Sequence, residues 1–265
     1  SNIVTGEILE ALTAVKTAVS ANYSAGDRIT YALSLVNTGT AAITDYTVTD
    51  NLGGYTVGAN TVYPLAYNAG TMRYYINGVL QAAPTVTAGP PFTVTGLTVP
   101  AGGSAVLIYE TTATPVAPLA TGSSITNTAT ITGGGLTTPI TAQATVETAN
   151  SADLTISKAL SPTTVTENGQ ITYTFVISNT GNTEATATGN VVVTDTFAPI
   201  LRNIAVTYNG TAWTEGTNYT YNAATGVFTT LAGQITVPAA TFTQNTDGTF
   251  TVTPGTATLV ITGTV

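Results

Sequence analysis

The chain has 265 residues, a net charge of −8 and five basic residues, too few to build a surface that would neutralise nucleic-acid phosphates. Cysteine and histidine are absent, which excludes disulfides, thiolate or imidazole metal sites, and both cysteine and Ser-His-Asp catalysis. Charged residues make up 7% of the chain and threonine supplies 61 positions, a composition typical of β-structure. No apolar run approaches the ~20 residues of a spanning helix, so we expect no membrane insertion.

Residues 1–10 form an N-terminal arm with no counterpart in the repeat described next. Val4 and Ile8 would lie on one face of an extended strand, but Ile3 and Leu9 would lie on the other, so the alternation does not fix a register. A short helix from about Gly6 also fits the apolar spacing. We favour a strand over 13–19, because the repeat assigns that segment to one.

One long motif occurs twice, over residues 16–39 and 158–181. A displacement of 142 residues (158 − 16) superposes Lys16 on Lys158, together with an Ile-Thr-Tyr and an Asn-Thr-Gly segment. A Val-Thr-Asp segment recurs as well, ending at Asp50 and at Asp195. A repeat of this length predicts two copies of one domain, residues 11–149 and 150–265.

Both copies read as short β-branched runs separated by Gly, Pro and Asn turns, with Asn77-Gly78 and Asn209-Gly210 as hairpin signals. This spacing predicts an all-β fold of two tandem immunoglobulin-like β-sandwiches with an N-terminal extension. The expected strands are 13–19, 28–37, 45–50, 73–76, 92–94, 105–112, 124–132 and 141–148 in the first copy, and 171–178, 189–195, 204–208, 219–221, 227–229, 242–243, 250–253 and 257–262 in the second.

The second copy stops at the strand that corresponds to residues 105–112, whereas the first continues to Thr148. We therefore expect the second sandwich to lack its last strand or strands and to expose unpaired backbone groups beside an apolar cleft. The arm of one subunit would fill the groove of the next by β-strand addition, building an open head-to-tail filament. The alternative is that residues beyond 265 complete this sandwich.

Four segments carry a resemblance to known families: Lys158–Pro162, Gly169–Gly181, Val193–Asp195 and Asn127–Thr132. They resemble the repeat domain of bacterial and archaeal surface proteins known as domain of unknown function eleven. The first copy departs from that pattern at Val19-Ser20, where Leu-Ser-Pro would stand. The resemblance implies an immunoglobulin-like sandwich in cell-surface stalks, adhesins or fibres, with no assigned enzymology.

The two lysines of the chain occupy the same position of the repeat. In this respect the sequence is similar to Gram-positive pilin and adhesin domains that cross-link themselves through a Lys–Asn isopeptide bond, with the lysine on the first strand and the asparagine on the last. The resemblance implies a bond between Lys16 and Asn127. The alternative for each lysine is a surface side chain whose stem packs on the sheet.

Such a bond is chemically reasonable, because a buried amine loses charge and becomes nucleophilic while a protonated carboxyl polarises the amide. Asp50 and Asp195 are the preferred carboxyls, since both copies have one; Glu110 is the alternative, but its counterpart is Thr262. Each Asp is otherwise explained as a turn residue at a strand end. For Lys158, whose domain lacks the last strand, we hypothesise a bond to Asn2 of a neighbouring subunit.

The leading interpretation is a structural subunit of an extracellular, pilus-like fibre on a prokaryotic cell surface, with itself as partner, no cofactor and no enzymatic activity. The alternative is an adhesin or carbohydrate-binding stalk module of a larger protein, with host or surface glycans bound by tyrosines and Trp213. Aromatic residues are more often core or cross-strand pairs. Asp45 and Asp50 lie close enough in sequence to permit a calcium loop, although acidic residues are otherwise scattered.

Overall fold

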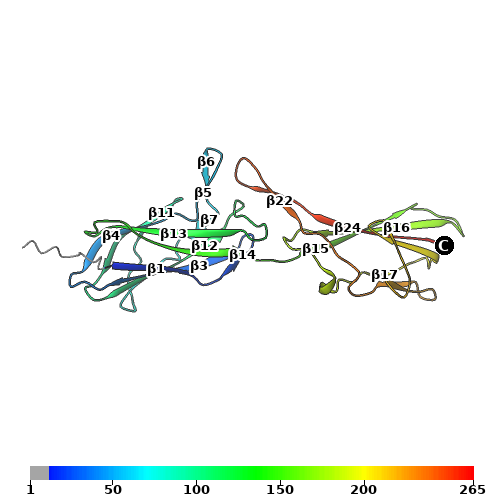
Figure 1. Ribbon diagram of the computed structural model, residues 1–265, viewed down its shortest axis with the longest axis horizontal. Helices are drawn as coiled ribbons and strands as arrows, with labels where there is room; N and C mark the ends of the chain where they lie inside the picture. Colours follow the sequence, from blue (N-terminus) through cyan, green and yellow to red (C-terminus); the bar gives the residue numbers. More distant parts are fainter. Residues whose placement is uncertain (1–11) are drawn as a thin grey trace, which may run out of the picture. The chain divides into compact units, whose positions relative to one another are not determined.

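The computed structural model describes residues 12–265, which divide by their contacts into two units. The first unit contains residues up to 149 together with 244–250, and the second contains 150–243 and 251–265. Residues 12–265 contain no helix that is long and apolar enough to cross a membrane. The all-β fold with two immunoglobulin-like sandwiches is confirmed, and the two units are described separately below (Figure 1).

The first unit consists of two six-stranded sheets, ordered β1-β3-β12-β8-β9 with β7 also paired to β12, and β10-β11-β4-β13-β14-β2. Burial alternates along β3 and β13, so every second side chain enters the core, including Tyr31, Leu33, Ala129 and Ile131. A small hairpin, β5-β6, stands beside them. The strands are β1 (Leu12–Ala18), β2 (Asn22–Tyr23), β3 (Arg28–Asn37), β4 (Ile43–Asp50), β5 (Tyr55–Val57), β6 (Asn60–Val62), β7 (Leu65–Tyr67), β8 (Arg73–Ile76), β9 (Val79–Leu80), β10 (Thr85–Thr87), β11 (Phe92–Val99), β12 (Ser104–Ala113), β13 (Ser124–Gly133) and β14 (Ile140–Thr148).

The second unit has a five-stranded sheet, β15-β16-β24-β18-β19, that follows the first sheet of unit 1 strand for strand. Its other sheet has three strands, β17-β21-β20, which correspond to β4, β11 and β10. The elements are β15 (Leu154–Ser161), β16 (Gln170–Asn179), the 3₁₀ helix η1 (Ala187–Gly189), β17 (Thr194–Thr196), β18 (Arg202–Tyr208), β19 (Thr211–Trp213), β20 (Tyr219–Asn222), β21 (Val227–Thr230), β22 (Thr241–Gln244), β23 (Phe250–Thr253) and β24 (Gly255–Thr264), with β22 and β23 paired as a hairpin.

The Asn-Thr-Gly repeat is a structural device. The fully buried Asn37 accepts a hydrogen bond from Gly39 N at 2.9 Å and donates to the backbone oxygens of Ala41 at 2.8 Å and Pro100 at 3.0 Å. Asn179 does the same in the second unit, with its Oδ1 accepting from Gly181 N at 2.9 Å. The motif therefore satisfies backbone groups at a turn that would otherwise be buried without partners.

The two predicted hairpins are present. Asn77 and Asn209 have positive φ angles of 48° and 47°, and each is followed by a glycine that also has positive φ. These dihedrals belong to the tight turns that match strand twist. Each asparagine also accepts a hydrogen bond from the neighbouring strand, from Ser104 N and Thr258 N, both at 2.8 Å.

The largest difference between the units lies beside β17. In unit 1, the corresponding strand β4 pairs with β11 on one side and with β13 on the other, and β13 pairs with β14. In unit 2, β17 pairs with β21, and within the described residues no strand pairs with its other side. This unpaired side is called the free edge of β17 below.

The strand expected over 13–19 is confirmed as β1, in which Leu12 is buried and Val15 is exposed, so the helical alternative fails over this segment. One expectation about local structure is wrong, because the predicted strand 189–195 shrinks to β17, after a 3₁₀ turn and Asn190 at a φ of 53°. Because the described residues pair with this segment on one side only, it is a regular strand only where it is hydrogen-bonded to β21. The several two- and three-residue strands, such as β2 and β10, were not predicted, because such short runs carry no periodicity.

Candidate functional site

Lys16 crosses the interior of the first unit. It lies on β1, in one sheet, and its Nζ donates to Asp50 Oδ2 at 2.7 Å, at the end of β4 in the opposite sheet. The side chains of Lys16 and Asp50 are 0% and 1% exposed. The ammonium also lies over the rings of Tyr31 and Tyr109, 5.0 Å and 5.9 Å from their centroids. This ion pair therefore joins the two sheets inside an aromatic cage.

Asp50 is held by more than the lysine. Its Oδ1 accepts from Leu52 N at 2.9 Å, and its Oδ2 accepts a short hydrogen bond from the Tyr109 hydroxyl. Burial raises the pKa of Tyr109 well above its usual value, and the Asp50 carboxylate raises it further. Tyr109 lies on β12 and went unnoticed in the sequence, because a tyrosine at an inward strand position normally signals packing alone.

Asn127 completes the cluster. It lies on β13 next to β4 and is fully buried, and among the described residues neither its Oδ1 nor its Nδ2 has a hydrogen-bond partner. Its amide is nevertheless close enough to Tyr31 and Tyr109 to lower the pKa of both phenols, against the larger effect of burial. A buried amide without hydrogen bonds costs roughly 1–3 kcal/mol, so this side chain needs an explanation other than stability.

Burial also changes the chemistry of Lys16. Desolvation lowers its pKa from 10.5 to about 8, and the Asp50 carboxylate opposes part of that shift. A substantial fraction of Lys16 is therefore neutral slightly above neutral pH, which is the nucleophilic form. The structure thus gathers an amine of lowered pKa, a carboxyl and an unpartnered amide in one buried place.

Lys158 occupies the same register in the second unit, since Lys16 pairs with Leu33 of β3 and Lys158 pairs with Phe175 of β16. It forms an ion pair with Asp195 Oδ2, and its Nζ lies 4.7 Å from the centroid of the Tyr173 ring. Its side chain is nevertheless 38% exposed, and that of Asp195 is 19% exposed. No described strand supplies an asparagine here, because the position of β13 is empty.

The strand that carries Lys158 is itself exposed. All of β15 except Leu154 is exposed, including Ile156 at 54% and Leu160 at 42%. In unit 1, the corresponding strand β1 lies close to β14, and its Leu12 and Lys16 are buried. Apolar side chains and an ion pair therefore line the surface beside the free edge of β17.

The remaining predicted residues lie elsewhere. Glu110 is on the surface, where it contacts Arg28 at 3.4 Å, so Asp50 and not Glu110 is the carboxyl at the lysine. Asp50 faces inward, and among residues 12–265 no group of acidic side chains could hold a metal ion, which removes the support for a calcium loop with Asp45. Asn2, Ile3, Val4, Ile8 and Leu9 lie outside the described residues.

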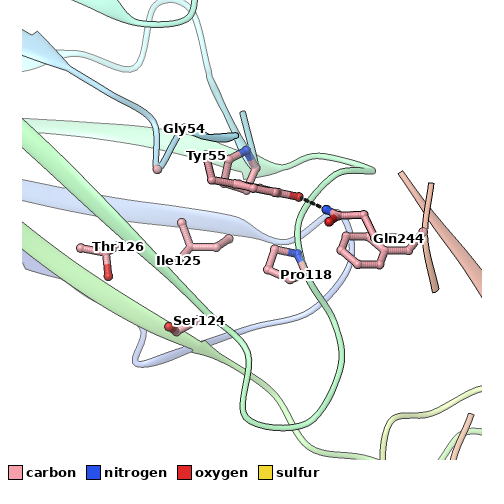
Figure 2. A pocket seen from close by; sticks show the side chains of 10 residues that line it. Gly54, Tyr55, Pro118, Ser124, Ile125, Thr126 and Gln244 are labelled. Carbon is pink, nitrogen blue, oxygen red and sulfur yellow. Dashed lines mark hydrogen bonds between the residues drawn. The ribbon is translucent and has the colours of Figure 1, made fainter. Parts of the chain in front are cut away.

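One cleft of about 570 Å³ lies in the first unit, lined by residues that all belong to it by their contacts. Figure 2 shows its polar centre, where Gln244 Nε2 donates to the Tyr55 hydroxyl at 2.9 Å. That hydroxyl in turn donates to Val116 O at 2.6 Å, so its hydrogen-bonding capacity is used internally. Trp213 stacks on Tyr208, with ring centroids 4.8 Å apart, an aromatic pair between the neighbouring strands β18 and β19.

No known protein-family profile matches the chain, and no curated protein matches it either. Among solved structures, a variant of the major pilin subunit of Bacillus cereus is similar over 92% of this chain and 65% of its own, at 15% identity and a TM-score of 0.42. The pilus backbone protein of Streptococcus pneumoniae is similar over 92% of this chain and 55% of its own, at 13% identity and a TM-score of 0.38. The chain thus spans less than two thirds of either pilin, and the similarity concerns the β architecture alone.

Proposed function

We propose that this protein is a structural subunit of an extracellular filament, in which residues 1–10 of one subunit add a strand to the free edge of β17 in the next. The observation that supports this most is the free edge itself, lying beside exposed Ile156, Lys158 and Leu160. An unpaired edge with an apolar border is costly to leave in water and is a template for an added strand. Because donor and acceptor are different surfaces, the contact repeats head to tail.

The pairing of β13 with β4 in unit 1 predicts the register of the added strand on β17. There Asp50 pairs with Ala129, and Asn127 lies two residues earlier along β13, on the same face. With Asn2 in the place of Asn127, Val4 stands opposite Asp195. Asn51, one residue after Asp50, donates its backbone N–H to Thr128 O at 3.0 Å. We therefore expect the corresponding N–H of Thr196 to donate to a backbone oxygen of the added strand.

The proposal includes covalent locks at both lysines. In unit 1, Lys16 attacks the amide of Asn127 with Asp50 as the carboxyl that exchanges protons, and ammonia leaves. Lys16, Asp50 and Asn127 are all buried in the core of unit 1, which supports a high effective molarity for this step. In unit 2, Lys158 bonds covalently to Asn2 of the neighbouring subunit, with Asp195 as the carboxyl. This bond makes the filament resistant to heating in detergent.

Assembly is tested by separating donor from acceptor. Deletion of residues 1–9 removes the donor, and Thr196→Pro removes an edge N–H without touching the hydrogen bonds that join β17 to β21 through Val193 and Phe197. Negative-stain images and sedimentation should show filaments for the unchanged chain, monomers for each variant alone, and dimers when the two variants are mixed. An unchanged chain that stays monomeric at all concentrations would contradict the proposal.

The covalent step has its own test. Lys158→Arg keeps the charge beside Asp195 but removes the nucleophile, so filaments should form and then fall apart to monomers in hot detergent. Lys16→Arg is the matched control, because it abolishes the internal bond of unit 1 and should leave the intersubunit ladder intact. A detergent-resistant ladder in Lys158→Arg would mean that another linkage holds the subunits.

A further inference from the structure

The hydroxyl of Tyr109 and the ammonium of Lys16 share one oxygen of Asp50. Asp50 uses Oδ1 to accept from Leu52 N and Oδ2 to accept from Lys16 and Tyr109. Among the described residues, no hydrogen bond joins Asp50 to Asn127, although both side chains are buried in the same cluster. A proton taken from Lys16 by Asp50 therefore needs a carrier to reach the Asn127 amide.

Tyr109 is hydrogen-bonded to one end of that path and lies near the other. Its hydroxyl donates to Asp50 Oδ2, the oxygen that faces the lysine, and Asn127, buried in the same cluster, lowers the pKa of the phenol although no described hydrogen bond joins the two side chains. Two neighbouring rings hold the Tyr109 ring in place. It stacks on Tyr31, with centroids 5.8 Å apart, and meets Phe92 edge-on, with centroids 5.2 Å apart. The hydroxyl is therefore held in one place, as proton transfer requires.

We propose that Tyr109 takes a direct part in forming the Lys16–Asn127 cross-link, and that its hydroxyl passes the proton from Asp50 to the departing nitrogen of Asn127. This inference rests on the proposed cross-link in unit 1. It assigns Tyr109 a role that the second unit does not repeat, because the corresponding residue of β24 is Ile261, which pairs with Tyr173 as Tyr109 pairs with Tyr31.

The step balances as follows. The Lys16 ammonium gives one proton to Asp50, and the neutral Nζ forms a bond to Cγ of Asn127. The Tyr109 hydroxyl donates its proton to Nδ2 and takes the proton of the Asp50 carboxyl in exchange, while the bond between Cγ and Nδ2 breaks. A second Nζ proton also leaves with the nitrogen, so the products are a secondary amide and ammonium, with the Asp50 carboxylate and the Tyr109 phenol restored.

The test uses Tyr109→Phe, which keeps the ring and removes the hydroxyl. The full-length chain is collected unfolded in denaturant, diluted to start folding, and sampled by mass spectrometry for the loss of one ammonia from unit 1, with Lys158→Arg in every sample to silence the second site. We expect the Tyr109→Phe chain to lose ammonia at least ~100-fold more slowly, the usual contribution of a positioned proton donor. Tyr46→Phe, which removes another buried phenol hydroxyl of the same unit, should react at the unchanged rate.

A purely structural role for Tyr109 is separated by two further measurements. In chains that also carry Asn127→Ala, Tyr109→Phe should leave the folded near-ultraviolet spectrum in place, which shows that the cluster still forms. D₂O should slow ammonia loss more in the unchanged chain than in the Tyr109→Phe chain, because only the unchanged chain transfers a proton through the phenol in the slow step. Ammonia loss at equal rates in both chains would overturn the role of Tyr109 and leave the cross-link standing, whereas no ammonia loss in the unchanged chain would overturn both.

Discussion

The two lysine sites have the same residues on the same strands and differ in their surroundings. Lys16 and Asp50 are sealed between two sheets, whereas Lys158 and Asp195 are partly open to solvent. The strands that seal the first site are β13 and β14, which have no counterpart among the described residues of unit 2. An ion pair whose residues are set by local sequence is therefore buried only where a strand from elsewhere in the chain covers it.

Removal of the acceptor amide from the closed site should have the largest effect. Asn127→Ala leaves the ion pair in place but prevents the cross-link, so we expect the unfolding free energy of unit 1 to fall by about 4–5 kcal/mol, the chain-entropy value for a closed loop of roughly 100 residues. Denaturant unfolding followed by circular dichroism measures it. Thr126→Ala, on the outer face of the same strand, is the control, and equal stabilities for the two variants would contradict the cross-link.

Removal of the carboxyl should cost more stability at the closed site than at the open one, even when no cross-link can form. In the Asn127→Ala background, Asp50→Ala leaves a buried lysine without its partner and should cost unit 1 about 3–5 kcal/mol. Asp195→Ala opens a pair that solvent already screens and should cost unit 2 at most about 1 kcal/mol. Fluorescence of Trp213, the one tryptophan of the chain, reports unit 2 separately. Equal losses would mean that burial does not distinguish the sites.

The pH dependence of ammonia release tests which protonation state of the closed site reacts. Below its pKa of about 8, Lys16 is mostly ammonium and carries the proton that passes through Asp50 to the Asn127 nitrogen; above that pKa this proton is lost to solvent. The rate of mass loss during refolding should therefore be nearly constant below that pKa and fall about tenfold for each pH unit above it. Refolding yields measured on Asn127→Ala at each pH control for folding itself, and a rate that rises with pH below that pKa would show that the proton of Lys16 must first be lost to solvent.

The smallest expected effect concerns the exposed face of β15. Ile156→Thr should change the unfolding free energy of isolated subunits by at most about 0.5 kcal/mol, because more than half of this side chain is already in water. The same change should weaken filament formation, since the added strand would cover it. Val15→Thr, at an exposed position of β1, is the matched control and should affect neither property. Normal assembly of Ile156→Thr would remove β15 from the proposed interface.

The repeat alone predicted much of this architecture. Alternating Thr, Val and Ile with Asn-Gly turns specify β-strands and hairpins locally, which is why β3, β8, β12, β13 and β16 lie within one or two residues of their expected bounds. The shared position of Lys16 and Lys158 was likewise visible in the sequence. The strands and hairpins depend on side-chain periodicity and turn chemistry within short segments, whereas Asn127 was implied as the partner of Lys16 only by the resemblance to isopeptide-forming pilin domains.

Only the tertiary structure decided what those residues meet. That Asp50 and not Glu110 receives Lys16 follows from which face of β4 and β12 turns inward, and that Tyr109 shares the same carboxylate oxygen follows from packing between two sheets. The shortening of β17 has the same origin, because a segment keeps strand geometry only where a neighbour pairs with it. Contacts between residues far apart in the chain set burial, and burial sets the pKa of Lys16, so no local pattern could have predicted either.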